Sequence, residues 1–174
     1  MHTIFETSRL LVQSIHLPDD LVSLLAIHNH LNTMRWIPNN KTPWTSEDLV
    51  KKYQLNQQLY PQQLGLYKIV LKNQVPDRLI GEVGLFPCTD SLTHVEIGYI
   101  FHENFWKQGL ATELLEAIAT FIQYHLPYTV IRAQLFDSNS ASQKLLERCA
   151  YQYEDAISLP LSGKKLIYHK YIIR

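Results

Sequence analysis

The chain has 174 residues, a length that suits one domain and is enough to bury a substantial core. Hydrophobic residues make up 46% and aromatic residues 11%, which is the composition of a globular protein and not of a disordered one. The 16 Lys and Arg residues balance the 16 Asp and Glu residues, so the formal net charge is zero. This balance argues against a nucleic-acid-binding protein, which would favour a basic stripe.

The sequence also argues against secretion, membrane insertion and metal binding. Cys88 and Cys149 lie among apolar residues, so we expect reduced core thiols. Two cysteines cannot build a structural zinc site alone, and we predict no metal. Residues 1–12 lack the positive region and long apolar run of a signal peptide. No stretch reaches the length of a membrane span, so we predict a cytoplasmic protein without a membrane partner.

The first part of the chain predicts a strand and two helices. Residues 9–14 form the strand. The Pro-Asp-Asp sequence at 18–20 predicts the start of a helix running to about residue 31, because proline suits the first turn and acids suit the positive end of the helix dipole. A looser segment follows at 32–44. Thr-Ser-Glu-Asp at 45–48 then carries the capping chemistry of a second helix.

The rest of the chain alternates between strand-like and helical patterns. The predicted strands are 66–71, 78–86, 95–101, 128–136, 151–159 and 165–173, with a turn at 73–77 and helices at 110–124 and 139–149. This order predicts an α/β (α+β) fold over residues 1–174 as a single domain, with a central mixed, mostly antiparallel sheet flanked by helices on both faces. The two strands of the piece 95–136 should be parallel and joined by a right-handed crossover.

The segment from Trp106 to Thr112 opens directly into the amphipathic helix at 110–124. Gly109 and Ala111 are small at positions where a backbone must come close to another group. Free N–H groups at a helix start attract anions, and Lys107 adds a positive charge. The pattern predicts a phosphate or pyrophosphate pocket, with an ordinary turn as the alternative. It is neither a Walker A loop nor a dinucleotide-binding fingerprint.

Three segments together resemble the GNAT acetyltransferases, and most closely their RimJ/RimL-type, ribosomal-protein branch. Glu-Ile-Gly-Tyr at 96–99 and Phe-Trp-Lys-Gln-Gly-Leu-Ala-Thr-Glu at 105–113 are similar to the family's motif A, in which Gln or Arg is usual where Trp106 stands. Residues 139–151 resemble the family's Asn-x-x-Ser-x-x-Leu-x-Glu-Lys-x-Gly-Phe pattern, and residues 6–12 resemble the branch's opening strand. The resemblance spans nearly the whole chain, with the segments in the family's order.

The resemblance implies acetyl-CoA as the cofactor. Asn139 would bond the pantetheine amide, and the end of the strand 95–101 would pair with the pantetheine arm. A backbone N–H near Ile97, Gly98 or Tyr99 would polarise the thioester carbonyl. The pyrophosphate would be held by backbone N–H groups of Lys107, Gln108, Gly109, Leu110, Ala111 and Thr112.

Two residues are the candidate proton-transfer groups. Glu96, on the strand beside the thioester, is the predicted general base, and its alternative role is a structural carboxylate. Several relatives use a tyrosine as the acid where this chain has Leu146, so Ser142 is the substitute acid, with a plain polar helix residue as the alternative. Because proximity alone supplies much of the rate, neither group need be essential.

The acceptor pocket should come from residues 32–44 and the two N-terminal helices. Arg35, Trp36 and Trp44 are candidates to line it, and the alternative is that both tryptophans simply cover the core. Glu82 is the runner-up base by its place on the neighbouring strand, and we include it among the acceptor-binding residues.

Three functions are compatible with this sequence. The first is transfer of an acetyl group, by direct attack in a ternary complex, to a protein N-terminal amine or lysine. The second keeps the enzyme but uses a small amine such as an aminoglycoside, a polyamine or an amino acid. The third is a CoA-binding module without transfer activity. A homodimer is expected by analogy, with residues 166–173 as an exposed pairing strand.

Overall fold

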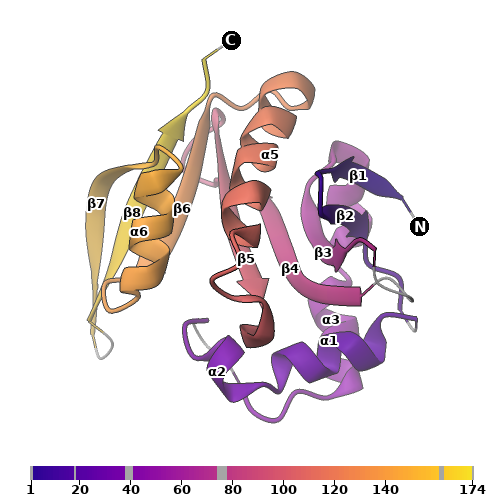
Figure 1. The fold of residues 1–174 in the computed structure, drawn as a ribbon. Coiled ribbons are helices and arrows are strands. Elements are labelled where there is room, and N and C mark those ends of the chain that lie inside the picture. The colour runs from indigo at the N-terminus through magenta and orange to yellow at the C-terminus, as the bar shows by residue number, and fades with distance from the viewer. Residues whose placement is uncertain (1, 18, 38–40, 74–77, 161–162, 174) are drawn as a thin grey trace. The chain divides into compact units, whose positions relative to one another are not determined.

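The computed structural model describes residues 2–17, 19–37, 41–73, 78–160 and 163–173 (Figure 1). Its strands are hydrogen-bonded in the order β1-β2-β3-β4-β5-β6-β8-β7, as one eight-stranded sheet. The α+β class and the mixed, mostly antiparallel sheet flanked by helices are therefore confirmed. The chain divides into two compact units, 1–84 with 99–110 and 85–98 with 111–174, called here the N-terminal and C-terminal units.

The N-terminal unit contains the first strands and most of the helices. Its elements are β1 (Thr3–Glu6), β2 (Leu10–Ser14), α1 (Leu21–His28), α2 (Leu31–Met34), α3 (Ser46–Tyr53), α4 (Asn56–Leu59), the 3-10 helix η1 (Tyr60–Gln62), β3 (Gly65–Leu71) and the 3-10 helix η2 (Glu103–Phe105). The strands β4 (Arg78–Pro87) and β5 (His94–Phe101) run through both units.

Hydrophobic alternation builds the core of the N-terminal unit. β2 pairs antiparallel with β3, and its residues Leu10 and Val12 are fully buried together with Ile69 of β3. β1 pairs antiparallel with β2 on the other side. We did not predict β1, because a strand of four residues carries too little alternation to stand out from its flanking sequence.

The helices of this unit follow their capping signals where these are strong. Residues 45–48 begin α3, as predicted from their capping chemistry, and the structure shows that Thr45 and Asp48 form a reciprocal capping box there. The first helix is shorter than expected and ends at His28, and α2 forms inside the segment expected to be loose. Residue 18, residues 38–40 and most of the predicted turn at 73–77 lie outside the described residues.

The C-terminal unit combines parallel and antiparallel pairing. Its remaining elements are α5 (Leu110–His125, which enters this unit at Ala111), β6 (Val130–Phe136), α6 (Ser140–Arg148), β7 (Gln152–Leu159) and β8 (Gly163–Tyr171). β5 and β6 are parallel, which confirms that part of the predicted crossover, while β8 pairs antiparallel with both β6 and β7. The expected exposed pairing strand at 166–173 is thus wrong over the length of β8, because both of its sides are taken and β7 is the edge.

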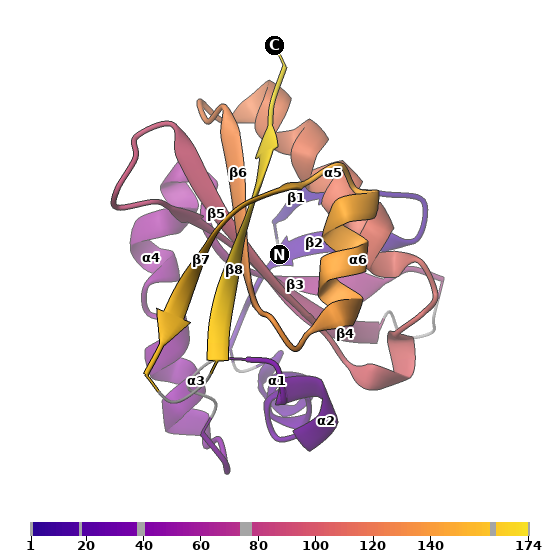
Figure 2. The ribbon, with the colours of Figure 1, turned by 90° about the vertical axis from the view of Figure 1, so that its left-hand side faces the viewer.

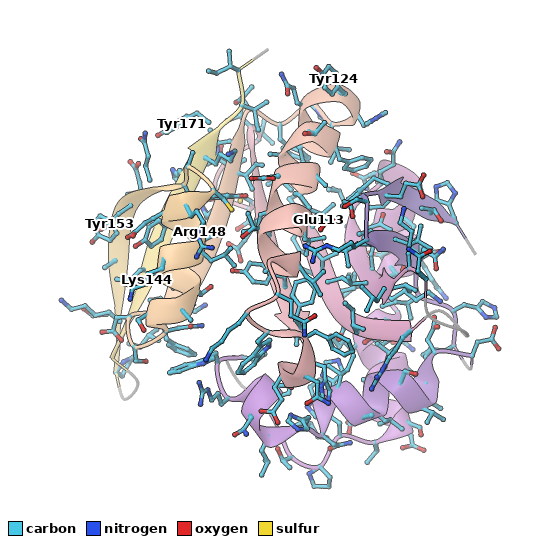
Figure 3. The ribbon with its side chains drawn as sticks, in the orientation of Figure 1. Glu113, Tyr124, Lys144, Arg148, Tyr153 and Tyr171 are labelled. Atoms are coloured by element: carbon cyan, nitrogen blue, oxygen red, sulfur yellow. The ribbon has the colours of Figure 1, made fainter. Side chains whose placement is uncertain are left out.

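Helices α5 and α6 cover one face of these strands (Figures 1 and 2). The apolar stripe predicted for α5 is confirmed, since Leu114, Leu115, Ile118 and Ile122 are all buried. Alternate residues of β6 and β8 point the opposite way, so that Gln134 and Lys165 lie together on the other face. Figure 3 labels exposed side chains of this unit, with Lys144 and Arg148 projecting from α6, Tyr153 from β7 and Tyr171 from β8.

Candidate active site

The loop that leads into α5 adopts the conformation needed to expose its backbone. Lys107 and Gly109 both have left-handed φ angles, 59° and 76°. The loop is braced on its N-terminal side, where the indole N–H of Trp106 donates to the carbonyl of Phe101 at 2.6 Å. Where the sign of φ alternates from one residue to the next, the backbone N–H groups turn toward one side, which is the geometry of an anion-binding turn. The segment therefore suits a phosphate group at the start of a 16-residue helix.

Two glycines leave the backbone open where a cofactor would approach. A Cβ placed on Gly109 would meet only Arg9 Nη2, at 3.5 Å, and one placed on Gly98 would meet nothing within 4 Å. Gly98 directly follows Ile97, which pairs with Ala133 of β6. Both positions can accept a ligand against the main chain, so these residues fit a phosphate-bearing cofactor with an extended arm.

Arg9 is a neighbour of this loop that the sequence did not indicate. Its Nη1 donates to the carbonyl of Gln108 at 2.9 Å, although 99 positions separate the two residues. Both lie in the N-terminal unit. The guanidinium therefore brings a permanent positive charge to the loop, beside the exposed Lys107.

Glu96 lies on β5 in the C-terminal unit, on the face of the strands away from α5 and α6. Its carboxylate accepts a 2.7 Å hydrogen bond from Gln134 Nε2. Gln134 Oε1 in turn accepts from Lys165 Nζ at 3.3 Å. Glu96, the predicted base, is thus half-buried, and the donor that bonds it, Gln134, is neutral. The cation, Lys165, bonds to Gln134 and not to Glu96 itself. The hydrogen bond from Gln134 fixes the orientation of this carboxylate.

Asn139 and Ser142 come together at the start of α6. Asn139 is the N-cap residue, and its side-chain oxygen accepts a hydrogen bond from the Ser142 N–H at 3.2 Å. Leu146, which stands where the resemblance would place a tyrosine acid, is 1% exposed and belongs to the core. Position 146 therefore holds no group able to give a proton.

The acceptor candidates fall into two places within the N-terminal unit. Arg35 is exposed and lies over Trp36, with its guanidinium carbon 4.9 Å from the ring centre. The same guanidinium lies 5.8 Å from the Trp106 ring, so this pair reaches the loop before α5. Both tryptophans are half-buried, which means that they cover the core and still present an edge to solvent.

Trp44 and Glu82 belong to a second cluster, around a buried ion pair. Glu82 is 1% exposed, and its two oxygens lie 3.0 and 3.1 Å from Lys52 Nζ. His28 Nε2 donates a short hydrogen bond to the same carboxylate, and the Trp44 ring lies 4.7 Å from the His28 ring. Burial alone would raise the pKa of Glu82, but Lys52 and His28 outweigh it and lower that pKa to about 2.

The low pKa of Glu82 and its two bound partners limit its use as a general base. A carboxylate with so low a pKa is a weak proton acceptor, and its oxygens are occupied by Lys52 and His28. Sequence reasoning missed both partners, because 54 and 30 positions separate them from Glu82.

A third contact ties α2 to η2, just ahead of the loop. His30 Nε2 lies 3.2 Å from a Glu103 oxygen, and the Glu103 N–H donates to Thr33 Oγ1 at 3.1 Å. His28 and His30 thus point to different partners, as their spacing of two residues predicts. In the described ranges, no group of three or more His, Cys, Asp or Glu side chains is arranged to hold a metal ion.

Both cysteines are free, with Cys149 buried and Cys88 half-buried, and burial raises the pKa of each thiol. Within the part of the chain that the structure describes, no helix has the length and apolar character to cross a membrane.

Comparison with known proteins places the chain in a family. The family model described as an acetyltransferase (GNAT) domain matches residues 9–152. A curated relative, the N-acetyltransferase YoaA of Bacillus subtilis strain 168, itself uncharacterized, is 24% identical over 157 residues, which is 90% of this chain and 87% of YoaA.

Solved structures share the fold at low sequence identity. RimL, a ribosomal L7/L12 α-N-protein acetyltransferase solved with CoA, superposes with a TM-score of 0.81 at 16% identity, covering 98% of both chains. The spermidine N-acetyltransferase of Vibrio cholerae, solved with CoA and spermine, gives a TM-score of 0.76 at 16% identity and covers 95% of this chain and 97% of its own.

Proposed function

The chain belongs to the GNAT acetyltransferase family, and from this premise we propose that it acetylates a protein N-terminal amine or a protein lysine, as a member of the RimJ/RimL-type branch. It is an acetyl-CoA-dependent N-acetyltransferase. The observation that supports the assignment most directly is the left-handed, unobstructed Gly109 at the start of α5, where a phosphate can reach the backbone. We further propose that residues 1–174 act as one catalytic domain in the cytoplasm.

In this proposal the cofactor is held by main-chain groups at two places. The N–H groups of residues 107–112 bind the pyrophosphate, supported by the helix dipole. The backbone of β5 near Ile97, Gly98 and Tyr99 takes the extended arm, and Asn139 bonds an amide of that arm. Bound acetyl-CoA supplies an activated acyl group as a thioester.

The chemistry asks the protein for a neutral amine and a stabilised oxyanion. Attack forms the C–N bond and breaks the C–S bond, which releases a thiolate. A β5 N–H near Gly98 donates to the carbonyl oxygen as negative charge develops there. The Glu96 carboxylate accepts the amine proton, directly or through water, and Ser142 passes a proton from solvent to the thiolate, so that its hydroxyl is restored. The Gln134 bond to Glu96 supports this role, because it orients the carboxylate without a direct cation.

The charges near the acceptor candidates favour a peptide over a polyamine. Glu82, the acidic candidate, is already paired with Lys52, and Glu103 faces His30. Arg35 adds a positive charge, and the rings of Trp36 and Trp106 beside it add an aromatic surface. A polycation would need uncompensated acidic groups. A small-amine acceptor remains the second candidate, since the fold is shared with the spermidine enzyme of V. cholerae. A homodimer is also part of the proposal, with the edge strand β7 as its pairing strand.

Calorimetry with acetyl-CoA tests the proposal first, with Gly109→Glu as the matched variant. Wild type should bind, and the variant should not, because it places an anion where the pyrophosphate belongs. A panel of peptide N-termini, lysine peptides and small amines, read by CoA release, then identifies the acceptor. Well-folded wild type that does not bind acetyl-CoA would overturn the proposal. Binding with no CoA release from any acceptor would favour the module without transfer activity.

A further inference from the structure

A chain of hydrogen bonds runs across three strands of the C-terminal unit. It joins Glu96 on β5, Gln134 on β6 and Lys165 on β8. Gln134 Nε2 donates to Glu96 Oε2 at 2.7 Å, and Lys165 Nζ donates to Gln134 Oε1 at 3.3 Å. One neutral amide therefore links the carboxylate of the proposed base to an ammonium group.

The two ends of this chain favour one orientation of the amide between them. An ionised carboxylate only accepts hydrogen bonds, and an ammonium group only donates them. With its NH2 group toward Glu96 and its oxygen toward Lys165, the Gln134 amide satisfies both neighbours. Rotation of the amide by half a turn would set oxygen against oxygen at one end and donor against donor at the other. Lys165 thus holds the oxygen end, so that the NH2 end stays on Glu96.

The pairing of the strands brings these side chains within reach of one another. β5 and β6 are parallel, with Glu96 in register with Arg132, two residues before Gln134. β6 and β8 are antiparallel, with Lys165 in register with Phe136, two residues after Gln134. Residues two positions apart on a strand share a face, so Gln134 is the diagonal neighbour of both Glu96 and Lys165. All three side chains therefore start from positions that the sheet fixes.

The arginine in register with Glu96 is directed toward other groups. Arg132 Nη1 donates to both oxygens of Asp90, each at 2.9 Å, and Arg132 Nε lies 3.4 Å from His169 Nε2. The donor that orients the Glu96 carboxylate is the Gln134 amide. A general base must be held within hydrogen-bond reach of the proton that it takes, and small misplacements lower the rate. The orientation of this amide is therefore a requirement for catalysis by Glu96.

We propose that Lys165 is a positioning residue for acetyl transfer, which fixes the Gln134 amide and through it the Glu96 carboxylate. This inference rests on the proposed function, with Glu96 as the base. Lys165 acts through the amide and does not touch the reacting atoms. The arrangement differs from that of Lys52, whose ammonium binds both Glu82 oxygens directly.

The kinetic test compares Lys165→Met with Lys165→Arg, Gln134→Leu and a control, Lys164→Met. Lys164 is the matched control, because it is the preceding residue of β8 and its side chain points to the opposite face. CoA release is measured with the member of the peptide and amine panel that wild type acetylates fastest.

We expect kcat to fall by about tenfold in Lys165→Met and at least as much in Gln134→Leu, with the KM for acetyl-CoA unchanged. Lys165→Arg should recover most of kcat, since its guanidinium can donate to the same amide oxygen. Lys164→Met should match wild type. Thermal unfolding should give all four variants a stability close to that of wild type, because the substituted side chains are half-buried or exposed.

The double variant Gln134→Leu/Lys165→Met separates positioning from a direct role of Lys165. If Lys165 acts only through Gln134, its removal from Gln134→Leu should lower kcat no further, whereas independent effects would multiply. A further tenfold loss in the double variant would mean that Lys165 serves the reaction by another route, and the inference would be overturned.

The side-chain amide of Gln134 gives a readout that does not depend on turnover. In protein labelled with isotopic glutamine, the NH2 signals of Gln134 are identified by their absence from the spectrum of Gln134→Leu. Lys165→Met should move these signals, because the ammonium group no longer polarises the amide oxygen. Lys164→Met should leave them in place.

Each outcome bears on one of the two claims. Unmoved Gln134 signals or an unchanged kcat in Lys165→Met overturns the role of Lys165 and leaves the proposed function standing. An unchanged kcat in Glu96→Gln removes the base, and the inference with it, but leaves the transferase. Wild type that releases no CoA with any acceptor removes the proposed function and this inference together.

Discussion

Lys52 bridges both oxygens of Glu82, at 3.0 and 3.1 Å, although that carboxylate is only 1% exposed. Lys52 belongs to α3, Glu82 to β4, and the third partner His28 to the last turn of α1. One buried charge therefore fastens two helices to a strand of the N-terminal unit. Removing a partner from such a pair leaves the other charge buried and uncompensated, which costs far more than the pair itself contributes.

The first prediction is that Glu82→Gln strongly destabilises the fold. The change leaves the Lys52 ammonium without its counter-ion, and we expect the free energy of unfolding in urea to fall by about 3 kcal/mol. Lys72→Gln is the control, because the Lys72–Glu6 pair is largely exposed and should contribute less than about 1 kcal/mol. A Glu82→Gln variant as stable as the control would show that Lys52 turns out to solvent without cost.

The second prediction concerns acid. The pKa of Glu82 is lowered from an ordinary 4.5 to about 2, so the folded state holds the ionised form more strongly than the unfolded chain does. Its contribution to stability is complete above pH 4.5 and is lost as the pH falls toward about 2. The stability difference between wild type and Glu82→Gln should therefore shrink over that window. A difference that stays constant down to about pH 2 would contradict the assignment.

The third prediction uses two glycines on adjacent strands. A Cβ on Gly81 would lie 2.1 Å from the backbone oxygen of Ile100, whereas one on Gly98 would meet nothing within 4 Å. Gly81→Ala should lower the free energy of unfolding by about 2 kcal/mol, since backbone must move to admit the methyl group. Gly98→Ala should change it little. Equal thermal stability of the two variants would mean that β4 and β5 separate easily at this point.

The sequence was informative where local chemistry decides local structure. The apolar stripe of α5 and the helix start at residues 45–48 depend on residues a few positions apart, and both were predicted. The order of the predicted strands and helices along the chain was then enough to predict the class of fold. The short elements β1 and α2 were missed, because four residues are too few to establish a period.

The partners of the candidate site could not be predicted in this way. Arg9 meets Gln108 across 99 positions, and His28 meets Glu82 across 54. Such contacts are set by how the strands and helices pack, which no local pattern encodes. For the same reason Glu82 looked like an available carboxylate in the sequence, whereas the fold buries it beside a lysine and a histidine.

The fourth prediction tests the proposed base. Glu96→Gln should retain acetyl-CoA affinity, because the side chain keeps its size and can still accept the hydrogen bond from Gln134. The transfer rate at neutral pH should fall by about a hundredfold or more, since the amide cannot take the amine proton. Glu154→Gln, an exposed carboxylate on β7, is the control. Unchanged turnover in Glu96→Gln would leave Glu96 as a structural partner of Gln134 and make proximity the main source of rate.

The last prediction separates two roles of Asn139. As the N-cap of α6 its side-chain oxygen holds the Ser142 N–H, so Asn139→Ala should cost about 1 kcal/mol of stability. Asn139→Asp keeps a good capping oxygen and should unfold like wild type. It nevertheless loses the side-chain N–H donors and gains a charge, so acetyl-CoA affinity should fall in both variants if Asn139 bonds the pantetheine amide through these donors. Wild-type affinity in the aspartate variant would mean that Asn139 serves the helix alone, and that the arm of the cofactor is held by backbone.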